Sequence, residues 1–307
     1  MHAQSGILPP SSRFARFLVL RRHPDLSLPD IMAALRELAV ARARLQGQHP
    51  DAGLISVVAF GAALWQEMKG PLPAGWHELA PLQGKFSMPA DAADICLHIR
   101  SDSFDLCYEL AQLFMTRLAA HGGVEVLEEC AGFRYLDSRD LTGFIDGTEN
   151  PQTQQERAET ALLDDGEFAG SSFVFAQRYV HQLDKWHRLT VDAQEHVIGR
   201  SKLESIELDE DVMPPNSHVA RNVIEEDGEE LAILRHSLPY GQAGGEHGLF
   251  FMAYTKDLSI LDRMLANMFG TSGDEQSDRL LNFTTPVGGA YFFAPSEELL
   301  NTVVGED

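Results

Sequence analysis

The sequence of 307 residues has few basic residues and few long apolar runs, and each shortage excludes a class of protein. Lysine and arginine total 24 against 46 aspartates and glutamates, so the formal net charge is -22. Because nucleic acids and membrane surfaces are themselves negative, the charge argues against binding to either. Apolar runs such as 249–254 are far shorter than the roughly 20 residues of a membrane-spanning helix.

Cysteine is equally scarce. Cys96, Cys107 and Cys130 are odd in number and show no C-x-x-C spacing. This pattern argues against a disulfide framework or a zinc cluster and is typical of a reducing compartment. The N-terminus lacks the basic flank and apolar core of a signal peptide. We therefore expect a cytoplasmic protein.

The first half of the chain alternates short apolar runs with segments of helical periodicity. A hydroxyl cap at Ser27, a proline in the first turn and an acid at Asp30 predict the start of one helix. At 95–100, apolar residues alternate with Cys96, His98 and Arg100, which predicts a half-buried strand. The expected strands are 14–21, 55–60, 95–100 and 124–128, and the expected helices are 28–46 and about 106–122. Their β-α-β-β-α-β order is that of a ferredoxin-like unit.

The same order recurs in the second half. The expected strands are 173–179, 231–235, 249–254 and 290–294, and the expected helices are 190–197 and 259–268, with capping predicted at Thr190 and at Ser259. The prediction is an α+β protein of two ferredoxin-like units, with antiparallel sheets and helices packed on one face. The expected divisions are 1–135, a connecting segment at 136–170, and 171–307. Two unrelated α+β units are the alternative.

Three segments could carry chemistry. In the first, Gly143 and Gly147 lie on either side of Asp146. This arrangement suits a structural turn, a Mg²⁺ loop or an acid-base site. The second is His218 within the long insertion 200–230; no His or Cys follows at i+3 or i+4, so a metal held there would need a macrocycle such as a porphyrin. A purely structural role for His218 is the alternative.

The third segment is Arg235, which ends an apolar strand. A guanidinium in a dry site must meet an anion or a developing charge. An ordinary strand-end arginine with a surface partner is the alternative.

These segments together carry a family resemblance. The string Gly143-Phe-Ile-Asp-Gly-Thr-Glu-Asn-Pro151 resembles the G-x-x-D-G motif of the dye-decolourising peroxidases, in the form of their compact bacterial B-type group. The match continues through 198–202, 217–219, Arg235 and 278–281, in the expected order along nearly the whole chain. The family fold is a pair of ferredoxin-like units, and its cofactor is haem b. The resemblance therefore implies a haem site in the C-terminal half.

The resemblance also implies a role for individual residues. His218 would be the proximal ligand of the haem iron, and Asp278 would accept the other imidazole N–H. Asp146 and Arg235 would act on the distal face. The cofactor-binding residues would be Gly147 and Thr148 near the haem edge and Arg200 beside a propionate. Ser237 departs from those B-type members that have Asn at this position.

The implied activity is reduction of hydrogen peroxide and oxidation of small organic donors, such as dyes and phenolics, through a ferryl intermediate. The family commonly forms homo-oligomers. Trp186, Tyr135 and Tyr240 are candidate electron relays, although packing is the commoner role of such residues. A haem-handling protein for storage, delivery or iron release is the alternative, and a haem-free metal hydrolase using Asp146 is a third possibility.

Overall fold

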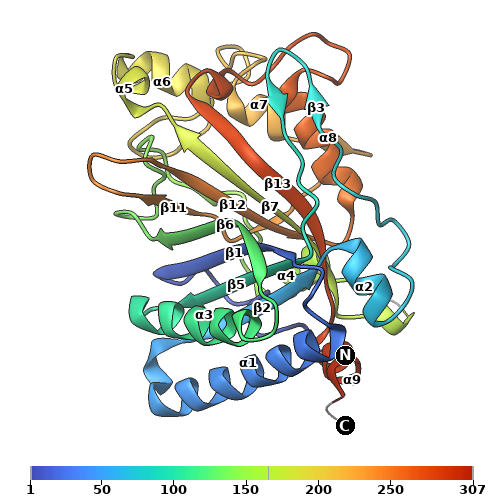
Figure 1. Ribbon diagram of the computed structural model, residues 1–307. Helices are drawn as coiled ribbons and strands as arrows, with labels where there is room; N and C mark the ends of the chain where they lie inside the picture. Colours follow the sequence, from blue (N-terminus) through green and yellow to red (C-terminus); the bar gives the residue numbers. More distant parts are fainter. Residues whose placement is uncertain (1, 165, 306–307) are drawn as a thin grey trace.

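Nine antiparallel strands form one sheet in the computed structural model, which describes residues 2–164 and 166–305 (Figure 1). The strand order is β10-β12-β7-β13-β2-β5-β1-β6, and β11 pairs with β12. The strands of the first half are β1 (Phe14–Arg22), β2 (Ile55–Phe60), β5 (Ile95–Ser101) and β6 (Val124–Phe133). Those of the second half are β7 (Ser172–His181), β10 (Leu234–Arg235), β11 (Leu238–Gly241), β12 (His247–Thr255) and β13 (Thr284–Ala294).

Helices and short elements fill the connections. The longer helices are α1 (Leu28–Gln48), α3 (Phe104–Ala119), α6 (Val191–Ile198), α8 (Leu258–Phe269) and α9 (Glu297–Val304). The shorter ones are α2 (Ala62–Met68), α4 (Gln154–Ala161), α5 (Leu183–Trp186), α7 (His218–Asn222) and the 3₁₀ turns Pro50–Ala52, Gly166–Phe168 and Arg279–Asn282. Two small hairpins pair β3 (Leu82–Gln83) with β4 (Ser87–Met88), and β8 (Glu225–Glu226) with β9 (Glu229–Glu230).

Each half of the sheet has the strand order of a ferredoxin-like unit. The order is β2-β5-β1-β6 in the first half and β10-β12-β7-β13 in the second, so equivalent strands occupy equivalent places. The two halves join where β13 pairs with β2 through Phe293 and Phe60. The predicted α+β class with antiparallel sheets is confirmed.

Helix starts follow the predicted capping in two places and differ in one. The Ser27 hydroxyl accepts from the Asp30 amide, and the Thr190 hydroxyl accepts from the Ala193 amide. The capping box predicted at Ser259 is wrong, because the Asp257 carboxylate caps α8 by accepting from the Ser259 amide at 2.9 Å. Ser259 therefore lies inside the first turn, where its hydroxyl cannot serve as the cap.

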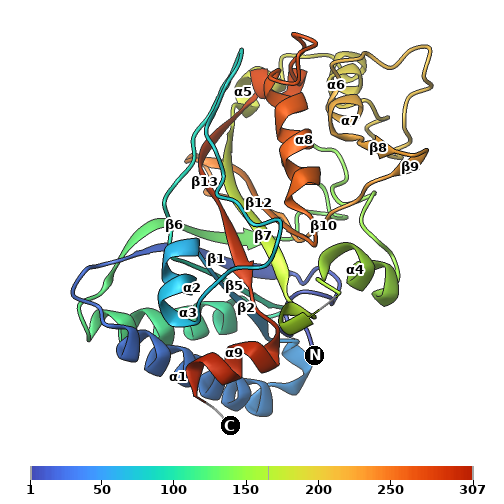
Figure 2. The same cartoon turned by 90° about the vertical axis from the view of Figure 1, so that its right-hand side faces the viewer.

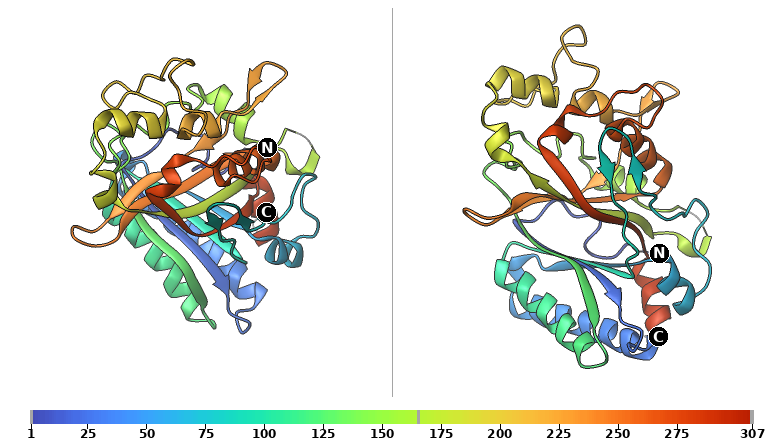
Figure 3. Two further views of the ribbon diagram at one scale, coloured as in Figure 1. Left: turned by 90° about the horizontal axis from the view of Figure 1, so that it is seen from above. Right: turned by 45° about the horizontal axis from the view of Figure 1, so that its top comes forward.

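The prediction of a half-buried β5 is also wrong, because every residue from Ile95 to Ser101 is buried. Ile95, Leu97 and Ile99 belong to the apolar cluster that also includes the buried side chains of α1 and α3. The even-numbered side chains of β5 face the second half of the sheet, where Phe17 of β1 stacks on Phe250 of β12 at 4.3 Å. The sheet curls on itself between the halves, and Figure 3 shows the two halves facing each other. A strand covered on both faces cannot expose alternate residues.

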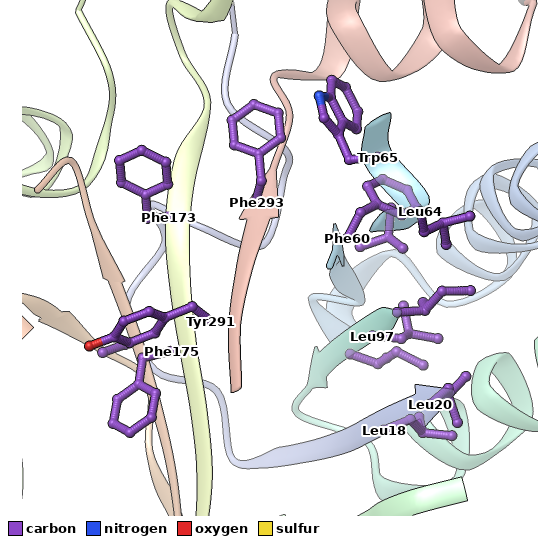
Figure 4. Close-up of a cluster of buried hydrophobic side chains, with 14 of the residues drawn as sticks. Leu18, Leu20, Phe60, Leu64, Trp65, Leu97, Phe173, Phe175, Tyr291 and Phe293 are labelled. Atoms are coloured by element: carbon purple, nitrogen blue, oxygen red, sulfur yellow. The ribbon is translucent and has the colours of Figure 1, made fainter. Parts of the chain in front are cut away.

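The helix-covered face forms the larger apolar core. Figure 2 shows α1 and α3 covering the first half and α8 covering the second. Figure 4 shows that this core is continuous across the junction, since Phe60 and Trp65 lie near Phe293 of β13. The Trp65 and Phe293 ring centroids are 4.8 Å apart. The two halves therefore share one core.

Within the described ranges, no helix combines the length and the apolar character that crossing a bilayer requires.

Candidate active site

The loop that carries Asp146 is anchored from both sides. Asp140 accepts a hydrogen bond from His181 of β7 at 3.0 Å, and its other oxygen accepts from the amide and the hydroxyl of Thr142. Burial raises the pKa of Asp140, but the His181 and Thr142 contacts outweigh it and lower the pKa to about 2. Phe144 is buried against Trp186 in a small cluster with α6. These contacts hold the residues that directly precede Asp146 in the chain.

Asn150 joins this loop to the strand that carries Arg235. Its side-chain oxygen accepts from the Arg235 amide, and its side-chain nitrogen donates to the Arg235 carbonyl, both at 2.8 Å. Gly147 has φ +81°, a conformation that favours glycine and lets the chain turn between Asp146 and Asn150. A single amide therefore sets the backbone of Arg235 relative to the Asp146 loop.

Asp146 and Arg235 face each other across a cavity of about 120 Å³, here called the Asp146 pocket. The pocket is lined by Ser11, Arg134, Tyr135, Ser138, Arg139, Asp146, Gly147, Asn150, Arg235, Ser237, Leu238 and Pro239. The Arg235 guanidinium lies 3.8 Å from the Asp146 carboxylate, beyond hydrogen-bond range, and each side chain is about a quarter exposed. The pocket thus holds an acid and a fixed cation that are both available to a ligand.

His218 and Asp278 form a second group, outside the lining of the Asp146 pocket. The His218 Nδ1 donates to Asp278 Oδ2 at 2.6 Å, and Asp278 Oδ1 accepts from the Leu280 amide at 2.8 Å. Asp278 is fully buried, whereas the His218 side chain is 30% exposed. Asp278 therefore caps the 3₁₀ turn that follows it and also holds the histidine.

Arg200 contacts the Asp146 loop at Glu149 and follows a glycine that adjoins Ser217. Its guanidinium pairs with Glu149, at 2.5 Å, and with Glu207. The preceding residue, Gly199, has φ +94° and ends α6, and a Cβ there would lie 2.9 Å from the Ser217 hydroxyl beside His218. Arg200 is thus already paired with two carboxylates. A haem propionate would have to share the guanidinium with them or replace one of them. Thr148 is half-buried and does not line the Asp146 pocket.

The donor set fits a haem better than a bare metal ion. No group of three or more His, Cys, Asp and Glu side chains in the described chain could hold a metal. The Nε2 atom of His218 makes no hydrogen bond to any described residue, while Nδ1 is held by a carboxylate. A ligand histidine typically has one nitrogen fixed in this way and the other free.

The three candidate relay aromatics have different surroundings. Trp186 is fully buried, and its indole N–H donates to the Thr142 carbonyl at 2.8 Å, so it supports the Asp146 loop. Tyr240 is buried beside Arg178 and accepts from its guanidinium at 3.1 Å. Tyr135 lines the Asp146 pocket. Tyr135 is therefore the candidate placed next to the pocket.

Sequence reasoning missed Asn150, Asp140 and His181 as residues that shape the site. Asn150 lies inside the motif Gly143–Pro151, and its side-chain amide, which can both donate and accept a hydrogen bond, was the signal that could have indicated its role. Asp140 and His181 are 41 residues apart and carry no shared local pattern.

Comparisons with known proteins identify the family of the chain. The family model described as "Dyp-type peroxidase, N-terminal" matches residues 4–134, and the model "Dyp-type peroxidase, C-terminal" matches residues 137–299. The chain therefore belongs to the Dyp-type, or dye-decolorizing, peroxidase family of oxidoreductases.

Three relatives cover almost the whole chain. A dye-decolorizing peroxidase of Mycolicibacterium paratuberculosis is 40% identical over 96% of this chain and 84% of its own. The structure of a dye-decolorizing protein from V. cholerae has a TM-score of 0.92 and 40% identity, covering 98% of this chain and 99% of that one. A variant of DypB from Rhodococcus jostii RHA1, solved in complex with heme, has a TM-score of 0.88 and 36% identity, covering 98% and 99%.

Proposed function

We propose that the protein is a haem b peroxidase in which His218 is the iron ligand and the Asp146 pocket receives hydrogen peroxide. The observation that carries the proposal is the His218 imidazole, whose Nδ1 is held by buried Asp278 and whose Nε2 bonds none of the residues that the structure describes. The heme-bound relative supports the choice of cofactor. When bound, haem would supply the iron chemistry that cleaves the peroxide O–O bond.

The protein's own residues would move the proton and balance the charge. The Asp146 carboxylate can accept a proton from one peroxide oxygen and return it to the other, directly or through water. The Arg235 guanidinium keeps its charge at any working pH and can stabilise the negative charge that develops as the bond breaks. Asp278 holds the Nδ1 proton of His218 and makes the imidazole a stronger electron donor.

Ser237 leaves the Asp146 pocket less polar than an asparagine would. Its hydroxyl accepts from the Met252 amide at 3.2 Å, so it is already engaged with β12. Organic donors such as dyes and phenolics would supply the two electrons that complete the cycle. The cytoplasmic location and the homo-oligomer stay predictions.

Titration of the haem-free protein with haemin tests the proposal. His218→Ala should abolish the intense Soret band of the complex, and added imidazole should restore part of it. His196→Ala is the matched control, because this histidine lies on α6 with its side chain 38% exposed. A full and unchanged Soret band in His218→Ala would contradict the ligand assignment.

Peroxide addition then separates the peroxidase from a haem-handling protein. A peroxidase should convert its haem spectrum within milliseconds to seconds and recover on adding a donor. A protein that binds haem weakly and reacts poorly with peroxide would support the alternative of storage, delivery or iron release.

A further inference from the structure

The segment Gly6–Ser11, here called the strap, ends at the Asp146 pocket and is held by arginine and histidine side chains. All six of its carbonyls accept hydrogen bonds from them. The donors are Arg100 to Gly6, Pro9 and Pro10 (2.7, 3.0 and 3.2 Å), His236 to Ile7 (2.6 Å), Arg157 to Leu8 (3.5 Å) and Arg134 to Ser11 (2.6 Å). Backbone carbonyls away from a sheet need such partners.

Arg100 is an unusual cation because it is 1% exposed and makes no ion pair with a carboxylate in the described chain. Carbonyl dipoles of the strap and the imidazole of His236 surround its charge instead, while its Nε has no hydrogen-bond partner among the residues described. Burial lowers the pKa of Arg100 to about 10, which leaves it charged at neutral pH. A buried charge of this kind stays only where its surroundings are tightly held.

His236 completes the arrangement in one fixed tautomer. Its Nδ1 accepts from Arg100 at 3.0 Å, so the proton lies on Nε2, which donates to Ile7. Burial, together with the charge of Arg100, lowers the pKa of His236 well below its usual value and keeps the ring neutral. His236 stands between Arg235 and Ser237, and both of these line the Asp146 pocket.

The strap is also tied to the Asp146 loop. Arg157 donates to Leu8 and also to the Pro151 carbonyl at 3.0 Å, directly after Asn150. Ser11, at the end of the strap, lines the pocket together with Arg134. The strap therefore contacts both the segment that carries Arg235 and the loop that carries Asp146.

We propose that the strap is a wall of the Asp146 pocket, and that Arg100 and His236 are positioning residues that fix this wall against Arg235. The inference rests on the proposed function only where it concerns peroxide; the placement of the strap is independent of haem. Loosening the wall should leave haem binding intact but let Arg235 drift, and a misplacement of about 1 Å can cost up to about 10²-fold in rate.

The test follows the strap with a nitroxide label on Ser11→Cys in the haem-free protein. Cys96, Cys107 and Cys130 are buried, so the label reacts at the exposed position 11. His236→Phe removes both contacts of the ring and should change the label from immobile to mobile. His236→Gln keeps a donor and an acceptor and should restore much of the immobile signal.

The matched control is His98→Phe. His98 is equally buried in the same cluster, bonds Tyr254 at 2.8 Å and stacks on Phe17, but makes no hydrogen bond to the strap. The label should stay immobile in this variant.

Without the label and with Ser11 restored, haem-loaded His236→Phe should react with peroxide about tenfold more slowly at unchanged haem occupancy. His98→Phe should stay within about twofold of the wild type. An immobile label in His236→Phe would overturn the proposal, as would an equal loss of rate in His98→Phe.

If His236→Phe does not fold, Arg157→Met carries the test, because it releases Leu8 and Pro151 from the opposite side. A mobile label and a slower peroxide reaction are again expected, and an immobile label overturns the proposal. If the wild-type protein binds haem but does not react with peroxide, the proposed function alone is contradicted. The mobility of the label in the haem-free protein would still test the proposal about the strap.

Discussion

At the residue scale, the gap between Arg235 and Asp146 is the main feature of the pocket. The 3.8 Å separation is short enough for an ion pair but leaves both side chains free of a mutual hydrogen bond. Their chemistry differs, since the guanidinium charge is permanent whereas a carboxylate exchanges protons that water can also carry. Their removal should therefore have unequal effects.

Arg235→Leu should slow the reaction with peroxide by roughly 10²- to 10³-fold, the loss typical of one electrostatic contact to developing charge. Asp146→Asn should cost less, because water can carry the proton. Stopped-flow absorbance of haem-loaded variants gives both rates. Arg13→Leu, at an exposed position near the strap, controls for the loss of a positive charge. A slower reaction in Asp146→Asn than in Arg235→Leu would reverse the ranking.

Asp278 controls the electron density of His218 in the proposed site. Asp278→Asn removes the charge opposite Nδ1 and should raise the Fe(III)/Fe(II) potential while haem stays bound. Spectroelectrochemical titration measures the shift. Asp192→Asn is the control, because this carboxylate on α6 is 85% exposed and does not contact His218. Equal potentials in Asp278→Asn and wild type would remove Asp278 as the partner of the ligand.

At the scale of elements, the Asp146 loop depends on the buried pair of Asp140 and His181. The pKa of Asp140 is lowered to about 2 from an ordinary value of 3.8. A lowered folded-state pKa stabilises the protein above the unfolded-state value, and this stability is lost as the pH falls through the folded-state value. The pair should thus contribute about 2 kcal/mol above pH 4, lost progressively towards pH 2.

Asp140→Asn should lower the free energy of unfolding by about this amount at pH 6, and its difference from wild type should shrink between pH 4 and pH 2. Urea unfolding at several pH values measures both effects. Asp25→Asn serves as control, since this side chain is 80% exposed and its contact with His23 is screened by solvent. A difference that stays constant with pH would show that Asp140 acts by packing alone.

Local signals predicted most of these elements, because capping and periodicity act over a few residues. Ser27 and Thr190 cap their helices as expected, and β2 has the predicted bounds of Ile55 and Phe60. Contacts between distant segments left no such signal. Asn150 meets Arg235 across 85 residues, and only folding brings them together.

The same limit explains the error at β5. The alternation of apolar and polar positions along 95–100 predicts one solvated face, yet His98 and Arg100 are buried. Those polar residues have partners inside the protein rather than in solvent, because His98 bonds Tyr254 and Arg100 bonds the strap. Hydrophobic patterning cannot distinguish a strand face exposed to solvent from a polar face that is buried, because both faces consist of the same residue types.

At the scale of the whole molecule, the two halves share buried apolar clusters, so we expect them to unfold as one unit. Phe17 is fully buried between β1 and β12, stacked on Phe250 at 4.3 Å. Phe17→Ala should therefore lower the free energy of unfolding by about 3–5 kcal/mol. The loss should appear as one shifted transition, because both halves share the apolar face that the cavity disrupts.

Urea unfolding followed by circular dichroism and by tryptophan fluorescence measures this effect. Phe104→Ala is the matched control, because this ring is 48% exposed and its removal should cost less than about 1 kcal/mol. Two separate transitions in Phe17→Ala would show that the halves unfold independently.

The place of β13 has a consequence for how the protein is made. It is the last strand in the described sequence, yet it lies in the middle of the sheet between β7 and β2. While the ribosome is still translating residues 284–294, the first unit can pair its own four strands, but β2 and β7 keep open edges that invite aggregation. We therefore expect nascent chains to need protection from aggregation until β13 has paired with both neighbours.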